Sequence, residues 1–250
     1  MDVRLEPALD AGSIDPLGDL RGCGLVSLLA HGRPEHMGST PVSEPRFRAV
    51  FFDFGGVLTT SVWDSFAEFL RDEGLDPDTI KNLFRHDPEA LADLRGLETG
   101  ALTEGEFETK FGRRLGLKDP EGLIDSMFAG MRPDERMVSA CREIRGAGML
   151  TGLISNSWST AHYDREMLTE LFDTAVISAE VHMHKPEPEI YRLAAERLNV
   201  SPEECIFVDD LRENCEGAEA VGMTPVRHRS APETITRLTE LTGISLAAAA

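Results

Sequence analysis

The feature that most constrains the fold is a series of short apolar runs that alternate with helical patterns. The first run, residues 49–54, ends at Gly55 and Gly56, which is typical of a buried strand followed by a tight turn. Four further runs occur at 150–155, 175–178, 205–208 and 224–227. The helical patterns among them span 161–172, 189–198, 212–220 and 232–241. This alternation predicts an α/β core, a doubly wound parallel sheet of Rossmann-like type with helices on both faces.

A helical segment interrupts the alternation directly after the first strand. It has no clear strand, and its predicted helices span 61–73, 78–85, 88–97, 104–115 and 121–131. Thr103 and Glu106 form a predicted capping box at the start of the fourth of these helices. Because the segment follows the first strand, we expect residues 59–132 to form a small inserted helical cap over the end of that strand.

The beginning of the chain differs from the rest in composition. Residues 1–46 are rich in Gly, Pro and Ser and lack sustained periodicity, so they predict a disordered arm. Met37 precedes the first strand closely, which leaves open whether residues 1–36 belong to the expressed protein. The α/β core is then expected to comprise residues 47–58 and 133–246.

Charge and composition disfavour several classes of protein. Acidic residues number 44 against 25 basic ones, a formal net charge of −19, whereas nucleic acids and anionic membranes attract positive charge. No apolar stretch approaches the roughly 18 residues that a membrane span needs. Cys23, Cys141, Cys205 and Cys215 lack the spacing of a zinc site and predict reduced thiols in a cytoplasmic protein. The sequence does not indicate the oligomeric state.

Polar residues stand where four of the predicted strands end. They are Asp53 after the first strand, Ser155 and Asn156 after the second, Lys185 in the loop after the third, and Asp209 and Asp210 after the fourth. In open parallel sheets, ligands bind at the carboxyl ends of the strands. We therefore expect these side chains to share one site.

Three of these residues are acids, which bears on the ligands of the site. Asp53, Asp209 and Asp210 gathered in one pocket would raise one another's pKa and destabilise the fold. One lysine does not balance three carboxylates. A hard divalent cation with oxygen ligands does.

Four ordered segments carry a family resemblance. They are Phe-Phe-Asp-Phe-Gly-Gly-Val-Leu at 51–58, Leu-Ile-Ser-Asn-Ser at 153–157, Lys-Pro at 185–186 and Phe-Val-Asp-Asp-Leu-Arg-Glu-Asn at 207–214. Together they resemble the four motifs of the haloacid dehalogenase-like hydrolase superfamily. The chain is most similar to the branch with a small helical cap after the first motif. That branch includes sugar phosphatases and the amino-terminal phosphatase domain of soluble epoxide hydrolases.

The resemblance implies a Mg²⁺-dependent phosphomonoester hydrolase that acts on a small phosphorylated metabolite. Asp53 would attack phosphorus and form an aspartyl-phosphate, which water then hydrolyses. Charge on the phosphoryl oxygens calls for a cation and N–H or O–H donors around them. The donors implied by the resemblance are Lys185, Ser155 and the amides around Gly55, Gly56 and Asn156.

The resemblance also implies a ligand set for the metal. Its members would be Asp53, the main-chain carbonyl of Gly55 and an acid of the later pair. We favour Asp210 as the direct ligand, with Asp209 bound directly or through water.

One position departs from the family pattern. Most phosphatases of the superfamily carry a second aspartate two residues after the nucleophile, and it protonates the leaving oxygen. Here that position is Gly55, although general acid–base help is typically worth about 10² to 10⁴ in rate. The leaving group could depart easily without an acid, as from an anomeric sugar phosphate, or His162, Tyr163 or a cap residue could supply the proton, and the sequence does not select among these. Glu98, directly after the third predicted cap helix, is expected to be solvated.

Two alternatives follow from this departure. A dehalogenase-type enzyme would use Asp53 to attack carbon without a metal, and the retained pair Asp209 and Asp210 argues against it. A catalytically weak module that senses phosphate or binds a partner is the other alternative. Retention of Asp53, Ser155, Lys185 and both acids at 209 and 210 argues against such a module.

Overall fold

The computed structural model describes residues 46–247. The predicted disordered arm therefore lies outside the described residues, apart from residue 46. Five strands form one sheet: β1 (Ala49–Phe52), β2 (Leu150–Ser155), β3 (Thr174–Ile177), β4 (Cys205–Asp209) and β5 (Thr224–Arg227). Their order is β3-β2-β1-β4-β5, and every neighbouring pair is parallel. The predicted doubly wound parallel sheet is confirmed.

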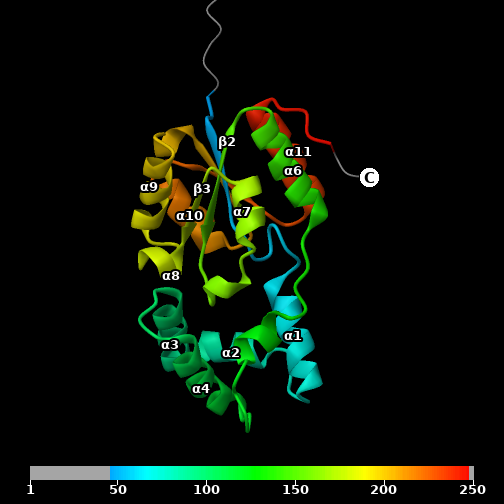
Figure 1. Cartoon of the computed structure of the whole chain (residues 1–250), viewed down its shortest axis with the longest axis vertical. Helices are drawn as coiled ribbons and strands as arrows, with labels where there is room; N and C mark the ends of the chain where they lie inside the picture. Colours follow the sequence, from blue (N-terminus) through cyan, green and yellow to red (C-terminus); the bar gives the residue numbers. More distant parts are fainter. Residues whose placement is uncertain (1–45, 248–250) are drawn as a thin grey trace, which may run out of the picture. The chain divides into compact units, whose positions relative to one another are not determined.

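Helices cover both faces of this sheet. One layer consists of α6 (Glu135–Gly146), α7 (Arg165–Leu171) and α11 (Ala231–Thr242), and the other of α9 (Pro188–Arg197) and α10 (Arg212–Ala220). Figure 1 shows the two layers on opposite sides of the strands. Alternate residues of β1 enter different layers, since Val50 and Phe52 pack with the first and Ala49 and Phe51 with the second. A central strand covered on both faces explains the continuous apolar run at 49–52.

Two features of the core differ from the sequence-based expectation. The helix α6 was not predicted. The helix predicted over 161–172 is interrupted: a 3₁₀ turn at Thr160–His162 precedes α7. Asp164 causes the break, because its side chain accepts hydrogen bonds from the amides of Glu166 and Met167 and so begins a new helix. Two short elements were also not predicted, α8 (Ser178–Val181) after β3 and a 3₁₀ turn (Pro202–Glu204) before β4.

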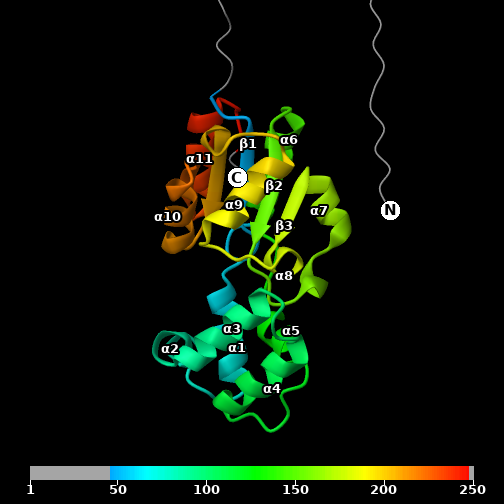
Figure 2. The ribbon, with the colours of Figure 1, turned by 90° about the vertical axis from the view of Figure 1, so that its left-hand side faces the viewer.

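Five helices lie between β1 and α6, and we refer to them as the cap helices. They are α1 (Val62–Asp72), α2 (Thr79–His86), α3 (Pro88–Glu98), α4 (Glu104–Leu115) and α5 (Leu123–Phe128). They enclose a hydrophobic cluster separate from the two clusters of the sheet. Figure 2 shows them grouped beyond the ends of the strands. The predicted capping box of Thr103 and Glu106 is present at the start of α4.

The two segments that join the cap helices to the sheet pair with each other. Thr59 and Pro133 form an antiparallel bridge, and the amide of Asp134 donates to the carbonyl of Leu58 over 2.8 Å. The chain therefore leaves for the cap helices and returns from them at one place.

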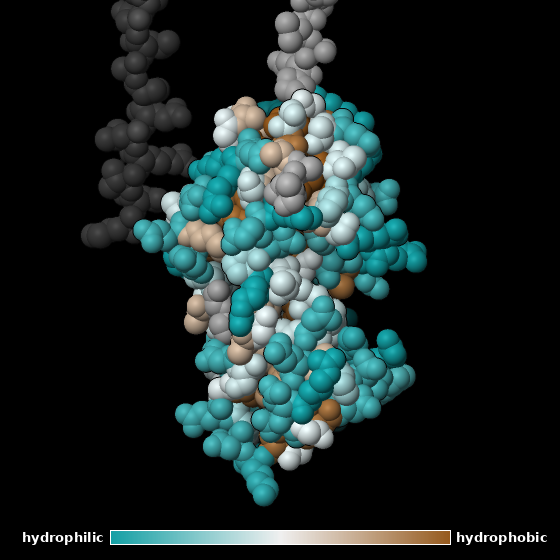
Figure 3. Space-filling view, turned by 90° about the vertical axis from the view of Figure 1, so that its right-hand side faces the viewer, coloured by the Kyte–Doolittle hydropathy of each residue, from teal (hydrophilic) through white to brown (hydrophobic). Residues whose placement is uncertain are grey.

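The face drawn in Figure 3 is largely hydrophilic, with hydrophobic residues scattered over it. No helix within residues 46–247 is long and apolar enough to cross a membrane. Cys141, Cys205 and Cys215 are free and buried, while Cys23 lies outside the described residues.

Candidate active site

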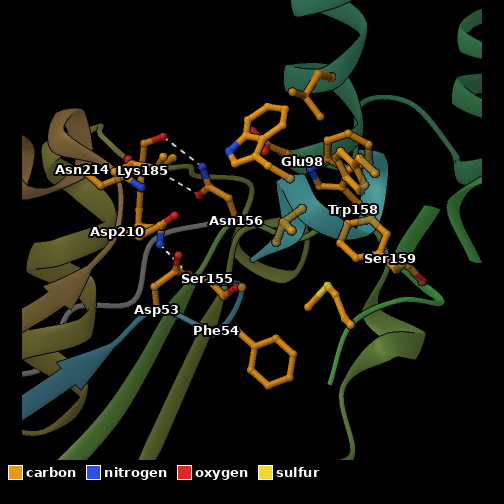
Figure 4. Close-up of a pocket in the computed structure, with 18 of the residues that line it drawn as sticks. Asp53, Phe54, Glu98, Ser155, Asn156, Trp158, Ser159, Lys185, Asp210 and Asn214 are labelled. Carbon is orange, nitrogen blue, oxygen red and sulfur yellow. Dashed lines mark hydrogen bonds and ion pairs between the residues drawn. The ribbon is translucent and has the colours of Figure 1, made fainter. Parts of the chain in front are cut away.

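The ends of β1 and β4 and the loop after β3 bring three charged residues into contact. The ammonium Nζ of Lys185 lies 2.7 Å from Oδ1 of Asp53 and 2.7 Å from Oδ2 of Asp209. All three side chains are buried, with Asp209 fully so. Figure 4 shows Asp53, Asp210 and Lys185 on one side of a pocket. The parallel topology thus brings together residues that are 24 to 156 positions apart in sequence.

Asp209 holds Lys185 in place. Besides the lysine, its carboxylate accepts hydrogen bonds from the amide of Leu211 over 2.8 Å and from Nδ2 of Asn214 over 3.0 and 3.1 Å. Burial lowers the pKa of Lys185, but the charges of Asp209 and Asp53 outweigh that effect and raise it. Lys185 therefore stays protonated beside Asp53.

Asn156 fixes the main chain of the same lysine. Its Nδ2 donates to the carbonyl of Lys185 over 3.0 Å, and its Oδ1 accepts from the amide of Lys185 over 2.8 Å. The sequence pointed to amides around Asn156 as phosphate donors and did not indicate this contact. The side chain of Asn156 positions the loop that carries the ammonium.

Ser155 lies in the pocket as expected, and Tyr163 lies against it. The two hydroxyl oxygens are 2.9 Å apart, and both side chains are buried. Burial raises the pKa of Tyr163, so its phenol stays protonated at neutral pH. Of the two named candidates for a proton donor, Tyr163 therefore borders the pocket and is already engaged with Ser155. The side chain of His162 lies outside what the structure describes.

The three acids form a cluster whose chemistry suits a hard cation. One carboxylate oxygen from each of Asp53, Asp209 and Asp210 lies within 4.8 Å of the others. Burial raises the pKa of Asp53 to about 7, although Lys185 opposes the rise, and burial together with Asp209 raises the pKa of Asp210 to about 6. A set of crowded oxygen donors with excess negative charge fits Mg²⁺ better than a softer metal.

The two glycines in the turn after Asp53 lie close to different side chains. Gly56 has φ +78°, and a Cβ there would lie 2.9 Å from Oδ2 of Asp210, so only glycine permits this close approach. At Gly55, a Cβ would lie 2.7 Å from Cγ2 of Val62 on α1. The space for a second acid is thus occupied by a cap residue.

The pocket extends from the strand ends to the cap helices. Its volume is about 210 Å³, while a cavity needs about 10–15 Å³ by the same measure to admit one water. Its polar end is formed by Asp53, Gly55, Ser155, Asn156, Lys185, Asp210 and Asn214. The remainder is lined by Phe54, Val62, Trp63, Phe66, Phe84, Leu94, Glu98, Phe128, Met131, Trp158, Ser159, Tyr163 and Leu211.

Sequence reasoning missed two residues of this pocket. Glu98 was expected to be solvated, yet it is only partly exposed and lines the pocket opposite Asp53. Trp158, three residues after β2, packs among the cap aromatics, with ring centroids 5.2 Å from Phe66 and 5.5 Å from Phe128. A tryptophan this close to the end of a predicted strand was the available signal. No local pattern indicated the position of Glu98.

Comparison with known proteins settles the family. Residues 47–222 match the family model described as haloacid dehalogenase-like hydrolase. The chain belongs to this family. The resemblance drawn from the four sequence motifs is therefore confirmed, and the chain is a hydrolase with the corresponding fold.

Several relatives of this haloacid dehalogenase-like hydrolase are phosphatases. A sesquiterpene phosphatase of Aspergillus oryzae is 32% identical over 205 residues, which cover 79% of this chain and 97% of the relative. A phosphatase of Mycobacterium tuberculosis is 33% identical, with coverage of 70% and 84%. The bifunctional epoxide hydrolase 2 of Rattus norvegicus is 26% identical, and the match covers 66% of this chain and 36% of that longer protein.

Solved structures agree on the fold. A haloacid dehalogenase family enzyme from Bacteroides thetaiotaomicron, in complex with magnesium and inorganic phosphate, superposes with a TM-score of 0.57 at 21% identity. That match covers 73% of this chain and 94% of the other. The L-2-haloacid dehalogenase of Xanthobacter autotrophicus gives 0.54 at 21% identity, with coverage of 80% and 84%. Both enzymes share the architecture of this chain.

Proposed function

We propose that this hydrolase is a Mg²⁺-dependent phosphomonoester hydrolase that acts on a small phosphorylated molecule through an aspartyl-phosphate. The observation that carries the proposal is the buried pair of Asp53 and Lys185 at the polar end of the pocket, 2.7 Å apart and beside two further acids. The phosphatase names of the Aspergillus and Mycobacterium relatives support the same reaction.

The residues at the polar end of the pocket take part in two successive displacements at phosphorus. One carboxylate oxygen of Asp53 attacks phosphorus while Lys185 holds the other. The bond from phosphorus to the alcohol oxygen breaks, and the alcohol departs with a proton. Water then attacks the phosphorus of the aspartyl-phosphate, which releases inorganic phosphate and restores Asp53. Lys185 and the hydroxyl of Ser155 stabilise the charge on the phosphoryl oxygens in both displacements.

The metal would be held by the acid cluster. The ligands would be Asp53, the carbonyl of Gly55 and Asp210, because both oxygens of Asp209 already accept hydrogen bonds. We therefore place Asp209 behind the ligands, in contact with the metal through water at most. When bound, Mg²⁺ would add positive charge beside the phosphoryl oxygens and the nucleophile.

The test is release of phosphate from p-nitrophenyl phosphate with Mg²⁺ present. We expect turnover by the wild type and a loss of about 10³-fold or more in Asp53→Asn, since no covalent intermediate can form. Asp72→Asn, an exposed residue at the end of α1, is the matched control and should keep full activity. Failure of the wild type to release phosphate from any phosphomonoester would refute the proposal.

The two alternatives give different results in the same assays. Release of chloride from 2-chloropropionate in the presence of EDTA would identify a dehalogenase. Binding of inorganic phosphate with no turnover of either substrate would identify a binding module.

A further inference from the structure

The chemical character of the pocket beyond the phosphate end bears on the substrate, if the proposed function holds. Besides Tyr163, ten of its lining side chains are apolar or aromatic: Phe54, Val62, Trp63, Phe66, Phe84, Leu94, Phe128, Met131, Trp158 and Leu211. They come mainly from the cap helices and from the segments after β1 and β2. The group attached to the phosphate would therefore be surrounded by hydrocarbon.

Few polar groups in this region are available to a substrate. The hydroxyl of Tyr163 is hydrogen-bonded to Ser155, and the hydroxyl of Ser159 accepts a hydrogen bond from the amide of Ala161 over 3.1 Å. A sugar would have to bury several hydroxyl groups here, and each one left without a hydrogen-bond partner weakens binding. Apart from the carboxyl of Glu98, the described lining offers them little.

The apolar wall is built before any substrate arrives. Trp158 contacts Phe66, Phe84, Phe107 and Phe128, with ring centroids 5.2 to 5.8 Å apart. Interlocked aromatic rings hold their positions through mutual packing. An apolar ligand would gain contact with this wall and lose little side-chain entropy there.

We propose that the substrate is the phosphate monoester of an apolar alcohol, whose hydrocarbon part fills the space between Trp158 and the cap helices while its phosphate lies against Asp53 and Lys185. The alcohol is a hydrocarbon chain or ring system with few or no further hydroxyl groups.

A series of phosphate monoesters tests the proposal. We expect kcat/KM to rise from ethyl to decyl phosphate by up to about fourfold per methylene until the pocket is filled. Geranyl phosphate should be hydrolysed at least 100-fold more efficiently than glucose 6-phosphate or glycerol 3-phosphate. A flat series, or a preference for the sugar phosphate, would overturn this inference while phosphate release itself would leave the proposed function standing.

Two variants on α3 test whether the pocket lining causes the preference for a hydrocarbon group. Leu94 lines the pocket, and Leu91, three residues earlier on α3, does not, although both are partly buried. Leu94→Asn should lower kcat/KM for decyl phosphate at least tenfold and change that for p-nitrophenyl phosphate less than threefold. Leu91→Asn should change neither by more than threefold. An equal loss on both substrates in Leu94→Asn would count against a hydrocarbon site.

A separate observation concerns the proton that such an alcohol needs. An alkyl alcohol leaves poorly as an alkoxide, so its oxygen must be protonated as the bond to phosphorus breaks. Gly55 offers no acid, and Val62 fills the space beside it. The pocket nevertheless contains a carboxyl on its cap side, Glu98 at the end of α3.

The surroundings of Glu98 suit a proton donor. Burial raises its pKa to about 7, while Lys185, a hydrogen bond from Trp158 and the charge of Arg95 oppose the rise and Asp53 adds to it. The rise favours the protonated carboxyl, which is the form that can donate a proton. Glu98 lines the same pocket as Asp53 and Lys185, on the side of the cap helices.

We infer that Glu98 is the catalytic acid that takes the place of the aspartate absent at Gly55. Its proton passes to the bridging oxygen as the bond from that oxygen to phosphorus breaks, and the neutral alcohol leaves. The resulting carboxylate of Glu98 then takes a proton from the water that attacks the aspartyl-phosphate. The cycle ends with Glu98 protonated and Asp53 ionised.

The dependence on the leaving group tests this role. Glu98→Gln should lower kcat/KM for decyl phosphate about 100-fold or more and that for 2,4-dinitrophenyl phosphate less than threefold, because kcat/KM reports the first displacement and a dinitrophenolate departs in it without a proton. Glu89→Gln, an exposed position on the same helix, should leave both rates unchanged. An equal loss on both esters would show that Glu98 has only a structural role.

Discussion

Gly55 and Val62 show how one pair of residues changes the chemistry open to an active site. A Cβ at Gly55 would lie 2.7 Å from Cγ2 of Val62, so the loop after β1 and the start of α1 exclude any side chain there. The difference from the usual family pattern is therefore built into two elements. Restoring the acid requires a change at both positions.

Substitution of these two positions gives the first prediction. Gly55→Asp alone should lower the free energy of unfolding by about 1–3 kcal/mol through overpacking, and should not raise kcat. Adding Val62→Ala should recover most of the lost stability, which urea denaturation measures. Gly105→Asp, where a side chain meets nothing within 4 Å, is the control and should be close to neutral. A fully stable single variant at Gly55 would contradict the steric argument.

At the scale of the elements, an ion-pair cluster joins two cap helices. Asp93 on α3 is bonded over 2.7 Å to Lys110 and over 2.7 Å to Arg114, both on α4. Arg114 also donates to Asp87, the residue that caps the start of α3. Burial of Asp93 works against its ionised form, but the hydrogen bonds from Lys110 and Arg114 outweigh it and hold its pKa below the ordinary 3.8.

The stability of the cap helices should accordingly depend on pH through Asp93. A lowered folded-state pKa gives stability that is present above the unfolded-state value and is lost as the pH falls through the folded-state value. Asp93→Asn should therefore cost about 1–3 kcal/mol at pH 7 and progressively less below about pH 4. Urea denaturation at both pH values measures this. A cost that stays constant with pH would mean that the charge of Asp93 does not matter.

At the same scale, the sequence predicted which residues meet at the ends of the strands, but it did not predict how the helices begin and pack. Asp53, Ser155, Lys185 and Asp210 were predicted to meet because parallel strands end at one edge of a sheet. The position of Glu98 follows from how α3 packs over that edge, and no local pattern encodes such packing. The break before α7 was missed because Asp164 lies inside an otherwise continuous helical pattern, and α6 was not recognised although Asp134 caps it.

At the scale of the whole molecule, the dominant property is negative charge. The chain carries a formal net charge of −19, and Asp53, Asp209 and Asp210 add a local concentration of it at the pocket. Self-repulsion destabilises a compact state, so a cation that binds only the folded chain should stabilise it.

Magnesium should raise the unfolding temperature by several degrees. At about 100 times its dissociation constant, a ligand adds about 2.7 kcal/mol, and each kcal/mol corresponds to about 2–4 °C for a chain of this size. NaCl at equal ionic strength separates binding from screening and should give a smaller shift. Asp210→Asn should abolish most of the shift that is specific to magnesium. Equal shifts from the two salts in the wild type would show that the cluster does not bind the ion.

The pairing of the two linkers at Thr59 and Pro133 affects how such an enzyme can evolve. Since the chain departs and comes back through adjoining segments, the intervening helices can be exchanged for others without disturbing the strand that precedes Asp53. Under the proposed function, the alcohol that is accepted could then change during evolution while the residues that bind the phosphate stay the same. A chimera that carries the corresponding segment of another phosphatase should inherit its preference among alcohols.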